Sequence, residues 1–291
     1  KALPKSVSHQ SSWKKSVFDT YSDASLNVEW CLDLQRECKK VGISFFTSPY
    51  SIELVDLVDT YVPAFKIGSG DITWHEIIRH IASKNKPYIL ATGASTMSEV
   101  REAVKTGLHI NDDLALLQCN TNYTGDLENF KYINLRVLHA FQKEFPNLVL
   151  GLSDHTPGHA TVLGAVALGA KIIEKHFTDD TTREGPDHAF SMDRSAWRDM
   201  VDRTRELELA LGSSDKSIEP NEKETSILQR RSTRAKLDIA EGCLITREMV
   251  EFLRPCPTEA IAPYDIEKII GKKLRINKTR GDCITWSDLD D

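Results

Sequence analysis

The sequence lacks the features that mark several large classes of protein. No apolar run approaches the roughly 20 residues that a membrane-spanning helix needs. No run of basic residues stands out and the formal net charge is −6, so nucleic acid and anionic membranes are poor partners. No GxGxxG fingerprint follows an expected strand, which weakens a dinucleotide-binding interpretation. We therefore expect neither a nucleic-acid partner nor a membrane partner.

Cysteine is present but not in a patterned form. The six cysteines are scattered along the chain without a CxxC pair, so neither a disulfide framework nor a zinc ribbon is predicted. We expect reduced thiols and a cytoplasmic protein. The length of 291 residues allows one large domain and one small one, and the 40% hydrophobic and 27% charged residues are typical of a globular protein.

Residues 43–176 repeat one pattern, in which a short apolar strand is followed by a polar or glycine-containing turn and then a helix. The expected strands cover 43–47, 64–68, 88–92, 114–119, 148–152 and 171–175. Helical periodicity is found over 28–40, 51–59, 75–82, 96–105, 130–145 and 161–168. This alternation predicts an α/β fold with a parallel sheet.

Polar residues follow every expected strand, which favours a closed (β/α)8 TIM barrel over an open doubly wound sheet. An open sheet concentrates its site near one switch point, whereas a barrel uses most of its strand ends. Six strands are found where a barrel needs eight, and residues 1–27 are polar and irregular. We therefore expect the first two βα units of the barrel to be missing from this chain.

The C-terminal part has a different pattern. A helix over 196–211 stops at Gly212, and the polar stretch 213–227 has the composition of a linker. Residues 228–291 alternate short apolar segments with turns, which predicts a β-rich module. A module of about 60 residues has a small core, so we expect it to dock on another surface. The predicted domains are thus a barrel over 1–212, a linker over 213–227 and the module over 228–291.

Two expected strands each end in a histidine. LVLGLSDHT contains His155 and AKIIEKHFT contains His176, one βα unit apart. Neighbouring strands of a barrel would bring both imidazoles to the same level at its catalytic face. With Asp154, Glu174 and Asp187 nearby in sequence, the pair indicates a divalent-metal site with open positions. A single histidine of this kind would more often be a hydrogen-bonded core residue.

These motifs together resemble the N-acetylneuraminate (sialic acid) synthase family, whose members condense phosphoenolpyruvate with an acylamino sugar. The matching stretches are FKIGSGD (65–71), ATG (91–93), QCNTNY (118–123), GLSDHT (151–156), EKHFT (174–178), GPDHAFSM (185–192), RRS (230–232), LRP (253–255) and SDL (287–289). The last three lie in a module similar to the antifreeze-like (SAF) domain that closes these enzymes. The resemblance implies a TIM-barrel synthase domain followed by an SAF domain.

The resemblance also implies three groups of site residues. His155 and His176 would bind the metal, and Glu174, Asp187 and Tyr123 would take part in catalysis. The substrates would be bound by cationic or hydroxyl side chains, namely Lys66, Ser69, Thr47, Ser48, Thr92, Thr121, Ser153 and Arg254.

Several of these residues have a second interpretation. Asp187 could simply cap a loop, and Glu174 either orients an imidazole or acts as a general acid or base. Arg254 taken alone is an ordinary surface arginine. The family has a single hydroxyl position where Thr47 and Ser48 both stand, and which of them aligns stays open.

The sequence departs from the family pattern at three places, and the departure at Thr121 leaves the sugar open. Ala91 stands where a serine usually precedes the TG pair, and Thr121 stands where the sialic acid enzymes carry asparagine. Residues 256–258 replace a glycine-rich turn after Arg254. The acceptor sugar implied by the resemblance is therefore either N-acetylmannosamine or one of the modified hexoses used by the bacterial legionaminic and pseudaminic acid synthases.

The resemblance implies a defined reaction and assembly. A divalent cation, expected to be Mn²⁺ with Mg²⁺ or Co²⁺ as substitutes, would act as a Lewis acid on the aldehyde of an N-acylated hexose. The products would be a nonulosonic acid and phosphate. The enzyme would be a domain-swapped homodimer in which Arg254 reaches the partner's site. Two alternatives stay open: another metal-dependent aldolase or phosphoenolpyruvate-condensing barrel, and a degenerate barrel that acts as a binding protein.

Overall fold

The computed structural model describes residues 15–183, 185 and 187–290. The chain divides into two compact units, Lys1–Gly212 and Ser213–Asp291, which are described separately below. Among the described residues, no helix combines the length and the apolar character needed to cross a membrane.

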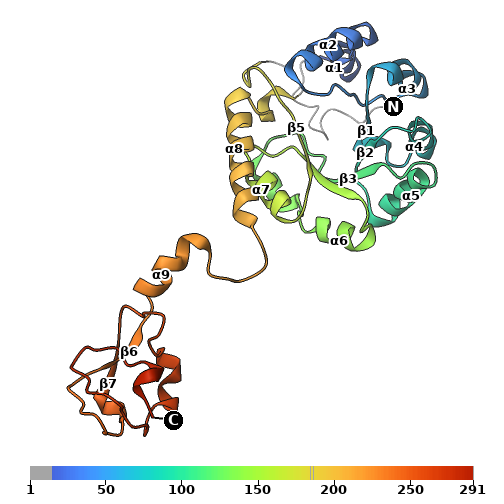
Figure 1. The fold of residues 1–291 in the computed structure, drawn as a ribbon. Coiled ribbons are helices and arrows are strands. Elements are labelled where there is room, and N and C mark those ends of the chain that lie inside the picture. Colours follow the sequence, from blue (N-terminus) through green and yellow to red (C-terminus); the bar gives the residue numbers. More distant parts are fainter. Residues whose placement is uncertain (1–14, 184, 186, 291) are drawn as a thin grey trace. The chain divides into compact units, whose positions relative to one another are not determined.

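The first unit is built on a curled parallel sheet. Its strands pair in chain order, and they are β1 (Phe65–Ile67), β2 (Tyr88–Ala91), β3 (Leu114–Cys119), β4 (Val149–Asp154) and β5 (Ile172–Lys175). In Figure 1 the strands follow an arc. The parallel α/β prediction is therefore confirmed, and the described residues form a five-stranded half-barrel. The prediction of a strand over 43–47 is wrong, because this segment makes only an isolated bridge from Thr47 to Phe65.

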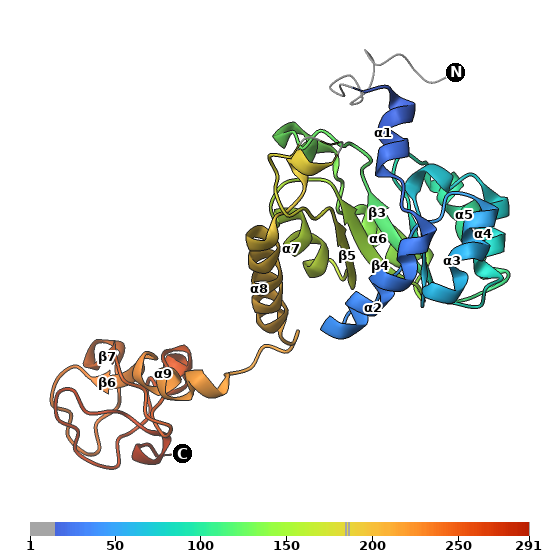
Figure 2. The ribbon, with the colours of Figure 1, turned by 90° about the horizontal axis from the view of Figure 1, so that it is seen from above.

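Helices alternate with these strands and lie on the outside of the arc (Figures 1 and 2). They are α3 (Ile52–Val58), α4 (His75–Ala82), α5 (Met97–Leu108), α6 (Val137–Glu144), α7 (Ala160–Ala167) and α8 (Arg194–Leu211). The prediction of one helix over 130–145 is wrong for the first half of that range. A 3-10 helix, η6 (Leu127–Tyr132), comes first. Asn134 then adopts a φ of 51°, which ends any helical path before α6 begins.

The segment before the sheet is more ordered than the sequence suggested. Residues 1–14 lie outside the described part, but α1 (Val17–Ala24) falls within the stretch expected to be irregular. The side chain of Ser16 accepts a hydrogen bond from the Asp19 amide and so caps this helix. A 3-10 turn, η3 (Val28–Trp30), leads into α2 (Cys31–Val41).

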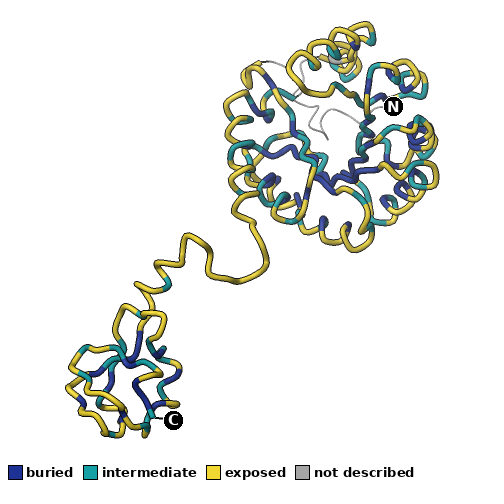
Figure 3. The backbone as a smooth tube through the Cα atoms, in the orientation of Figure 1, coloured by how far each residue is buried: buried dark blue, intermediate teal, exposed yellow. Residues whose placement is uncertain are grey.

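The main core of the first unit lies between the outer face of the sheet and the helices. Alternate strand residues such as Phe65, Leu116 and Leu152 are fully buried in it. Since successive side chains of a strand point to opposite faces, Lys66 and Ser153 belong to the inner face. Figure 3 shows buried strands surrounded by helices whose outer surfaces are exposed.

The second unit has its own core and little regular sheet. The antiparallel pair β6 (Ser232–Ala235) and β7 (Val250–Leu253) is supplemented by isolated bridges. Short 3-10 helices η9 (Arg247–Met249), η10 (Pro263–Lys268) and η11 (Trp286–Asp288) connect these segments. Fully buried Ile245, Ile261 and Ile284 pack at the centre. The polar stretch expected to be a linker contains η8 (Pro220–Glu222) and all but the last residue of α9 (Lys223–Leu228).

Candidate active site

The two histidines singled out by the sequence lie side by side at the C-terminal edge of the sheet. His155 directly follows β4 and His176 directly follows β5, and their ring centroids are 5.1 Å apart. Tyr123, from the loop after β3, has its ring 4.4 Å from that of His155 and 6.0 Å from that of His176. The ring of Phe190 lies 5.0 Å from His176 and closes the cluster on another side.

Hydrogen bonding fixes how the His155 ring is protonated. Its Nδ1 lies 2.9 Å from the backbone carbonyl oxygen of Asn120, which can only accept, so Nδ1 carries the proton and Nε2 keeps its lone pair. Burial lowers the pKa of His155, and the neighbouring His176 lowers it further. His155 is therefore held as a neutral imidazole with one nitrogen available as a ligand.

Asp187 plays the corresponding part for the second histidine. Its Oδ2 lies 3.4 Å from Nδ1 of His176, which leaves Nε2 of His176 facing away from the carboxylate. Burial opposes ionisation of Asp187, but the imidazoles of His176 and His155 outweigh it and hold the pKa below its usual range. An ionised carboxylate on Nδ1 is the usual orienting partner of a metal-bound imidazole.

Lys66 and Glu174 meet across the inside of the sheet. The Lys66 ammonium lies 3.1 Å from Oε2 of Glu174, and the Lys66 side chain is only 12% exposed. Oε2 is itself buried and has no aligned hydrogen-bond partner among the described residues, so the contact is an ion pair without a formed hydrogen bond. Neither of the two interpretations of Glu174 foresaw this partner.

This ion pair also shows that the sheet is strongly curled. Lys66 is on β1 and Glu174 on β5, the two edge strands. In a flat five-stranded sheet those strands would lie about 19 Å apart, from a spacing of about 4.8 Å per strand. Two side chains can span this distance only if the sheet bends strongly toward its inner face. The candidate site therefore lies on the concave face of the sheet.

A second group of polar atoms converges on Gly93. The Gly93 amide donates to Oγ of Ser69 at 2.9 Å. A Cβ on Gly93 would lie 2.3 Å from Oγ1 of Thr121 and 3.0 Å from Sγ of Cys119. Oγ1 of Thr121 is buried without a hydrogen-bond partner among the described residues. Burial raises the pKa of the Cys119 thiol, although the hydroxyls of Ser69 and Ser153 and the Lys66 charge oppose this.

The remaining hydroxyl residues of the prediction support the strands. The Thr47 carbonyl accepts from the Lys66 amide at 3.1 Å, and Oγ of Ser48 donates to the Lys66 carbonyl at 3.0 Å. Both residues therefore hold the segment that carries Lys66. Thr92 is buried, and its hydroxyl donates to the Leu117 carbonyl of β3 at 2.9 Å. The structure does not bring the Thr92 hydroxyl into the group around the histidines.

Asp154 does not join the histidines, which corrects the expectation that it lies at the metal site. Its carboxylate is on the opposite face of β4, where it pairs with Lys175 at 2.7 Å. Lys175 was not among the residues predicted from the sequence to lie near the site. The signal was available, because Asp154 alternates with Ser153 and His155, and Lys175 alternates with Glu174 and His176. His188, the chain neighbour of Asp187, has its Nδ1 2.6 Å from the Thr178 hydroxyl and so anchors the Asp187 segment.

The donor set of the site fits a cation that histidine binds. Both imidazoles engage Nδ1 with an oxygen and keep Nε2 for a ligand. Within the described residues, no group of three or more His, Cys, Asp or Glu side chains is arranged to hold a metal ion. Two protein nitrogens would thus leave several coordination positions for water and substrate oxygens.

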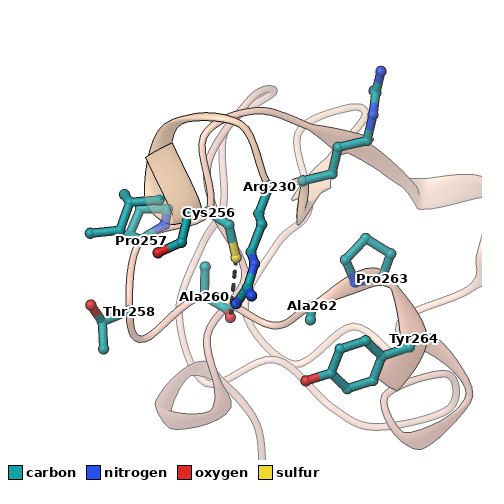
Figure 4. A pocket seen from close by; sticks show the side chains of 11 residues that line it. Arg230, Cys256, Pro257, Thr258, Ala260, Ala262, Pro263 and Tyr264 are labelled. Atoms are coloured by element: carbon teal, nitrogen blue, oxygen red, sulfur yellow. Dashed lines mark hydrogen bonds between the residues drawn. The ribbon is translucent and has the colours of Figure 1, made fainter. Parts of the chain in front are cut away.

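Arg254 belongs to the second unit, where its side chain is exposed. Two residues further along the chain, Cys256 lines a pocket together with Arg230, Tyr264 and other residues (Figure 4). Tyr264 is 85% exposed. Figure 4 shows the Arg230 side chain reaching toward Cys256 and the backbone of Ala260. A cationic and aromatic surface therefore flanks the Arg254 loop.

Comparison with known proteins decides the affiliation of the chain. The NeuB family model matches residues 2–216, and the SAF domain model matches residues 230–290. The chain belongs to the NeuB family. The resemblance stated from the motifs is thereby confirmed.

Relatives of this NeuB-family chain are named as sugar-acid synthases. The N,N'-diacetyllegionaminic acid synthase of Legionella pneumophila is 35% identical over 263 residues, which cover 88% of this chain and 72% of that protein. The human N-acetylneuraminate-9-phosphate synthase is 32% identical over 289 residues, which cover 98% of this chain and 78% of that protein. A crystal structure of the sialic acid synthetase of Leptospira borgpetersenii, in complex with citrate, is 27% identical with a TM-score of 0.66 and covers 71% of this chain and 72% of that one.

Proposed function

We propose that this NeuB-family synthase condenses phosphoenolpyruvate with an N-acylated hexose to give a nonulosonic acid and phosphate. The observation that carries the proposal is the concave group of two imidazoles, each with Nε2 available, next to the inward-facing Lys66–Glu174 pair. This group offers a cation site, an anion site and ionisable groups within one cluster.

Lys66 is proposed to bind phosphoenolpyruvate. The ligand carries close to three negative charges near neutral pH, and a buried ammonium forms strong charge-assisted hydrogen bonds to phosphate or carboxylate. Ser69, Ser153 and Thr121 add hydroxyl donors on the same face. Glu174 holds Lys66 in place before the substrate arrives, because the two charges lie 3.1 Å apart.

A divalent cation, proposed to be Mn²⁺ with Mg²⁺ or Co²⁺ as substitutes, would be held by His155 and His176. When bound, it would supply Lewis-acid polarisation of the sugar aldehyde. Asn120 and Asp187 keep the two imidazoles in the required tautomers. Tyr123 packs its ring against both histidines and so limits the access of water to them.

The bond changes balance as follows. Carbon C3 of phosphoenolpyruvate forms the new bond to the aldehyde carbon, and the aldehyde oxygen takes a proton. Water adds to C2 and gives up two protons, one to the aldehyde oxygen and one to the leaving phosphate, while the C2–O bond to phosphate breaks, C2 becomes the keto carbon and inorganic phosphate leaves. Glu174 and Asp187 are the ionisable groups proposed to move protons in these steps. Burial raises the pKa of Tyr123, so its phenol stays protonated and can donate a hydrogen bond to the sugar.

The assembly is part of the proposal. We infer that the half-barrel belongs to a complete (β/α)8 barrel, since its five strands follow chain order without a reversal and the sheet curls. We further infer a homodimer in which the SAF domain of one chain caps the site of the other and Arg254 contacts the N-acyl group. All six cysteines are free thiols, which supports a cytoplasmic setting.

A phosphate-release assay tests the reaction. The full-length protein that contains this chain is incubated with phosphoenolpyruvate and each member of a panel of N-acylated hexoses, with EDTA and then with added Mn²⁺. We expect release that requires one sugar, is abolished by EDTA and returns with Mn²⁺. Release without any sugar, or a rate unchanged by EDTA after complete removal of metal, would overturn the proposal. The sugar that supports the highest kcat/KM identifies the acceptor.

A further inference from the structure

A buried ion pair joins β4 and β5 immediately behind the two histidines. Asp154 and Lys175 are register partners in the parallel pairing of these strands. Their side chains are 0% and 2% exposed, and Nζ of Lys175 lies 2.7 Å from Oδ2 of Asp154. Each residue is the chain neighbour of one histidine, since Asp154 precedes His155 and Lys175 precedes His176. The pair therefore lies directly beside the backbone of both histidines.

Further hydrogen bonds tie the pair to the turn after His155. The Lys175 ammonium donates to the carbonyl of Thr156 at 2.6 Å. Oδ1 of Asp154 accepts from the Thr156 amide at 3.1 Å, and Oδ2 accepts from the Thr161 hydroxyl, in the first turn of α7, at 2.6 Å. The residues on both sides of His155 are thus fixed to β5 and to α7.

We propose that the Asp154–Lys175 pair positions the His155 and His176 imidazoles, and that it thereby sets the affinity of the site for a divalent cation. The inference rests on the proposed function where it concerns the cation. Neither residue touches the inner face, so both act through the histidines. Without the pair, strands β4 and β5 keep their backbone pairing but lose the side-chain link at the level where the histidines leave the sheet.

The expected loss follows from how such partners behave elsewhere. Outer partners that orient metal-binding histidines typically contribute about ten- to a hundred-fold to metal affinity. A buried pair also cannot lose one charge without leaving the other unpaired. Lys175→Met should therefore weaken cation binding by about ten- to a hundred-fold.

The experiment compares two lysine-to-methionine variants of the full chain, one at buried Lys175 and one at half-buried Lys86. Lys175→Met is tested beside Lys86→Met, because the Lys86 ammonium also bonds an aspartate, Asp59, at 2.7 Å and a backbone carbonyl, that of Val62, at 3.0 Å. Lys86 precedes β2 and so lies at the N-terminal ends of the strands, whereas the histidines follow the C-terminal ends. Mn²⁺ alone is titrated by calorimetry, and folding is checked by circular dichroism. We expect weakened Mn²⁺ binding in Lys175→Met and parent-like binding in Lys86→Met.

A folded Lys175→Met variant that binds Mn²⁺ like the parent overturns the inference. If this variant does not fold, the double variant Asp154→Asn/Lys175→Met replaces it, since neutralising both members of a buried pair is often tolerated. The same outcomes then decide.

A second readout separates this inference from the metal proposal. The ¹⁵N shifts of the His155 and His176 imidazoles are recorded without metal in the parent and in the same variant. If the parent binds no Mn²⁺, the metal site proposed above fails, and the shifts alone decide. Altered tautomer or environment of the rings then supports the positioning role, and unchanged shifts overturn it.

Discussion

Gly93→Ala is predicted to damage the candidate site through one methyl group. Gly93 follows β2 by two residues, and its φ is not positive, so alanine would cost no backbone strain there. The added Cβ would lie 2.3 Å from Oγ1 of Thr121, 2.9 Å from Oγ of Ser69 and 3.0 Å from Sγ of Cys119. The first two contacts are shorter than Cβ atoms essentially ever show, and the third is tighter than nine in ten real Cβ contacts.

The magnitude follows from the cost of overpacking. Three side chains from three segments must move together, and such crowding typically costs about 1–3 kcal/mol. For a domain of this size that range corresponds to a fall in melting temperature of roughly 2–12 °C. Since Oγ of Ser69 accepts the Gly93 amide, its displacement should also raise the KM for phosphoenolpyruvate.

The assay is thermal and urea unfolding of Gly93→Ala, with Gly70→Ala as the stability control. A Cβ on Gly70 would meet nothing within 4 Å, and its φ is not positive, so this control should match the parent in stability. Adding Thr121→Ala to Gly93→Ala removes the closest clash and should recover part of the loss. Equal stability of Gly93→Ala and Gly70→Ala, or no recovery in the double variant, would refute the reasoning.

Three further predictions concern the site. Lys66→Ala should raise the KM for phosphoenolpyruvate by about ten- to a hundred-fold, the worth of a charged hydrogen bond of roughly 1.5–3 kcal/mol, and steady-state kinetics that show only a higher sugar KM would contradict the assignment. The pKa of His155 is depressed in the fold, so below about pH 6.5 the unfolded chain takes up the proton first and the unfolding free energy falls. Chemical unfolding from pH 7 to pH 5 should show this slope in the parent and a shallower one in His155→Gln; parallel slopes would speak against it. A mixture of Arg254→Ala and His155→Ala chains should regain activity after subunit exchange, whereas no recovery would remove the proposed dimeric site.

The sheet could be predicted from local patterns, and its exceptions have local causes. Buried parallel strands appear as short apolar runs, and β1 to β5 fall at those runs. The segment 43–47 is also apolar, but it forms a single bridge at Thr47. The helix expected over 130–145 is interrupted because Asn134 takes a left-handed conformation that periodicity does not encode.

The candidate site was predictable where neighbouring strands supply it. His155 and His176 were expected at the same level, and their rings are 5.1 Å apart. The pairing of Lys66 with Glu174 could not be read in the same way, because it joins the first and last strands and depends on the curl of the whole sheet. Asp154 was assigned to the wrong face although strand alternation already excluded it, since Ser153 and His155 flank it.

The Lys66–Glu174 pair has a structural role and, under the proposed function, a chemical one. It links the edge strands across the concave face at 3.1 Å, yet Oε2 of Glu174 has no aligned hydrogen-bond partner in the described part of the chain. Under the proposed function, an incoming anion would compete with Glu174 for the Lys66 ammonium. The Glu174 carboxylate would then be free to accept or return a proton, which is the role proposed for it above. If both roles hold, this one ion pair would couple anion binding to the release of a base, so Lys66→Ala should lower kcat as well as raise the KM for phosphoenolpyruvate.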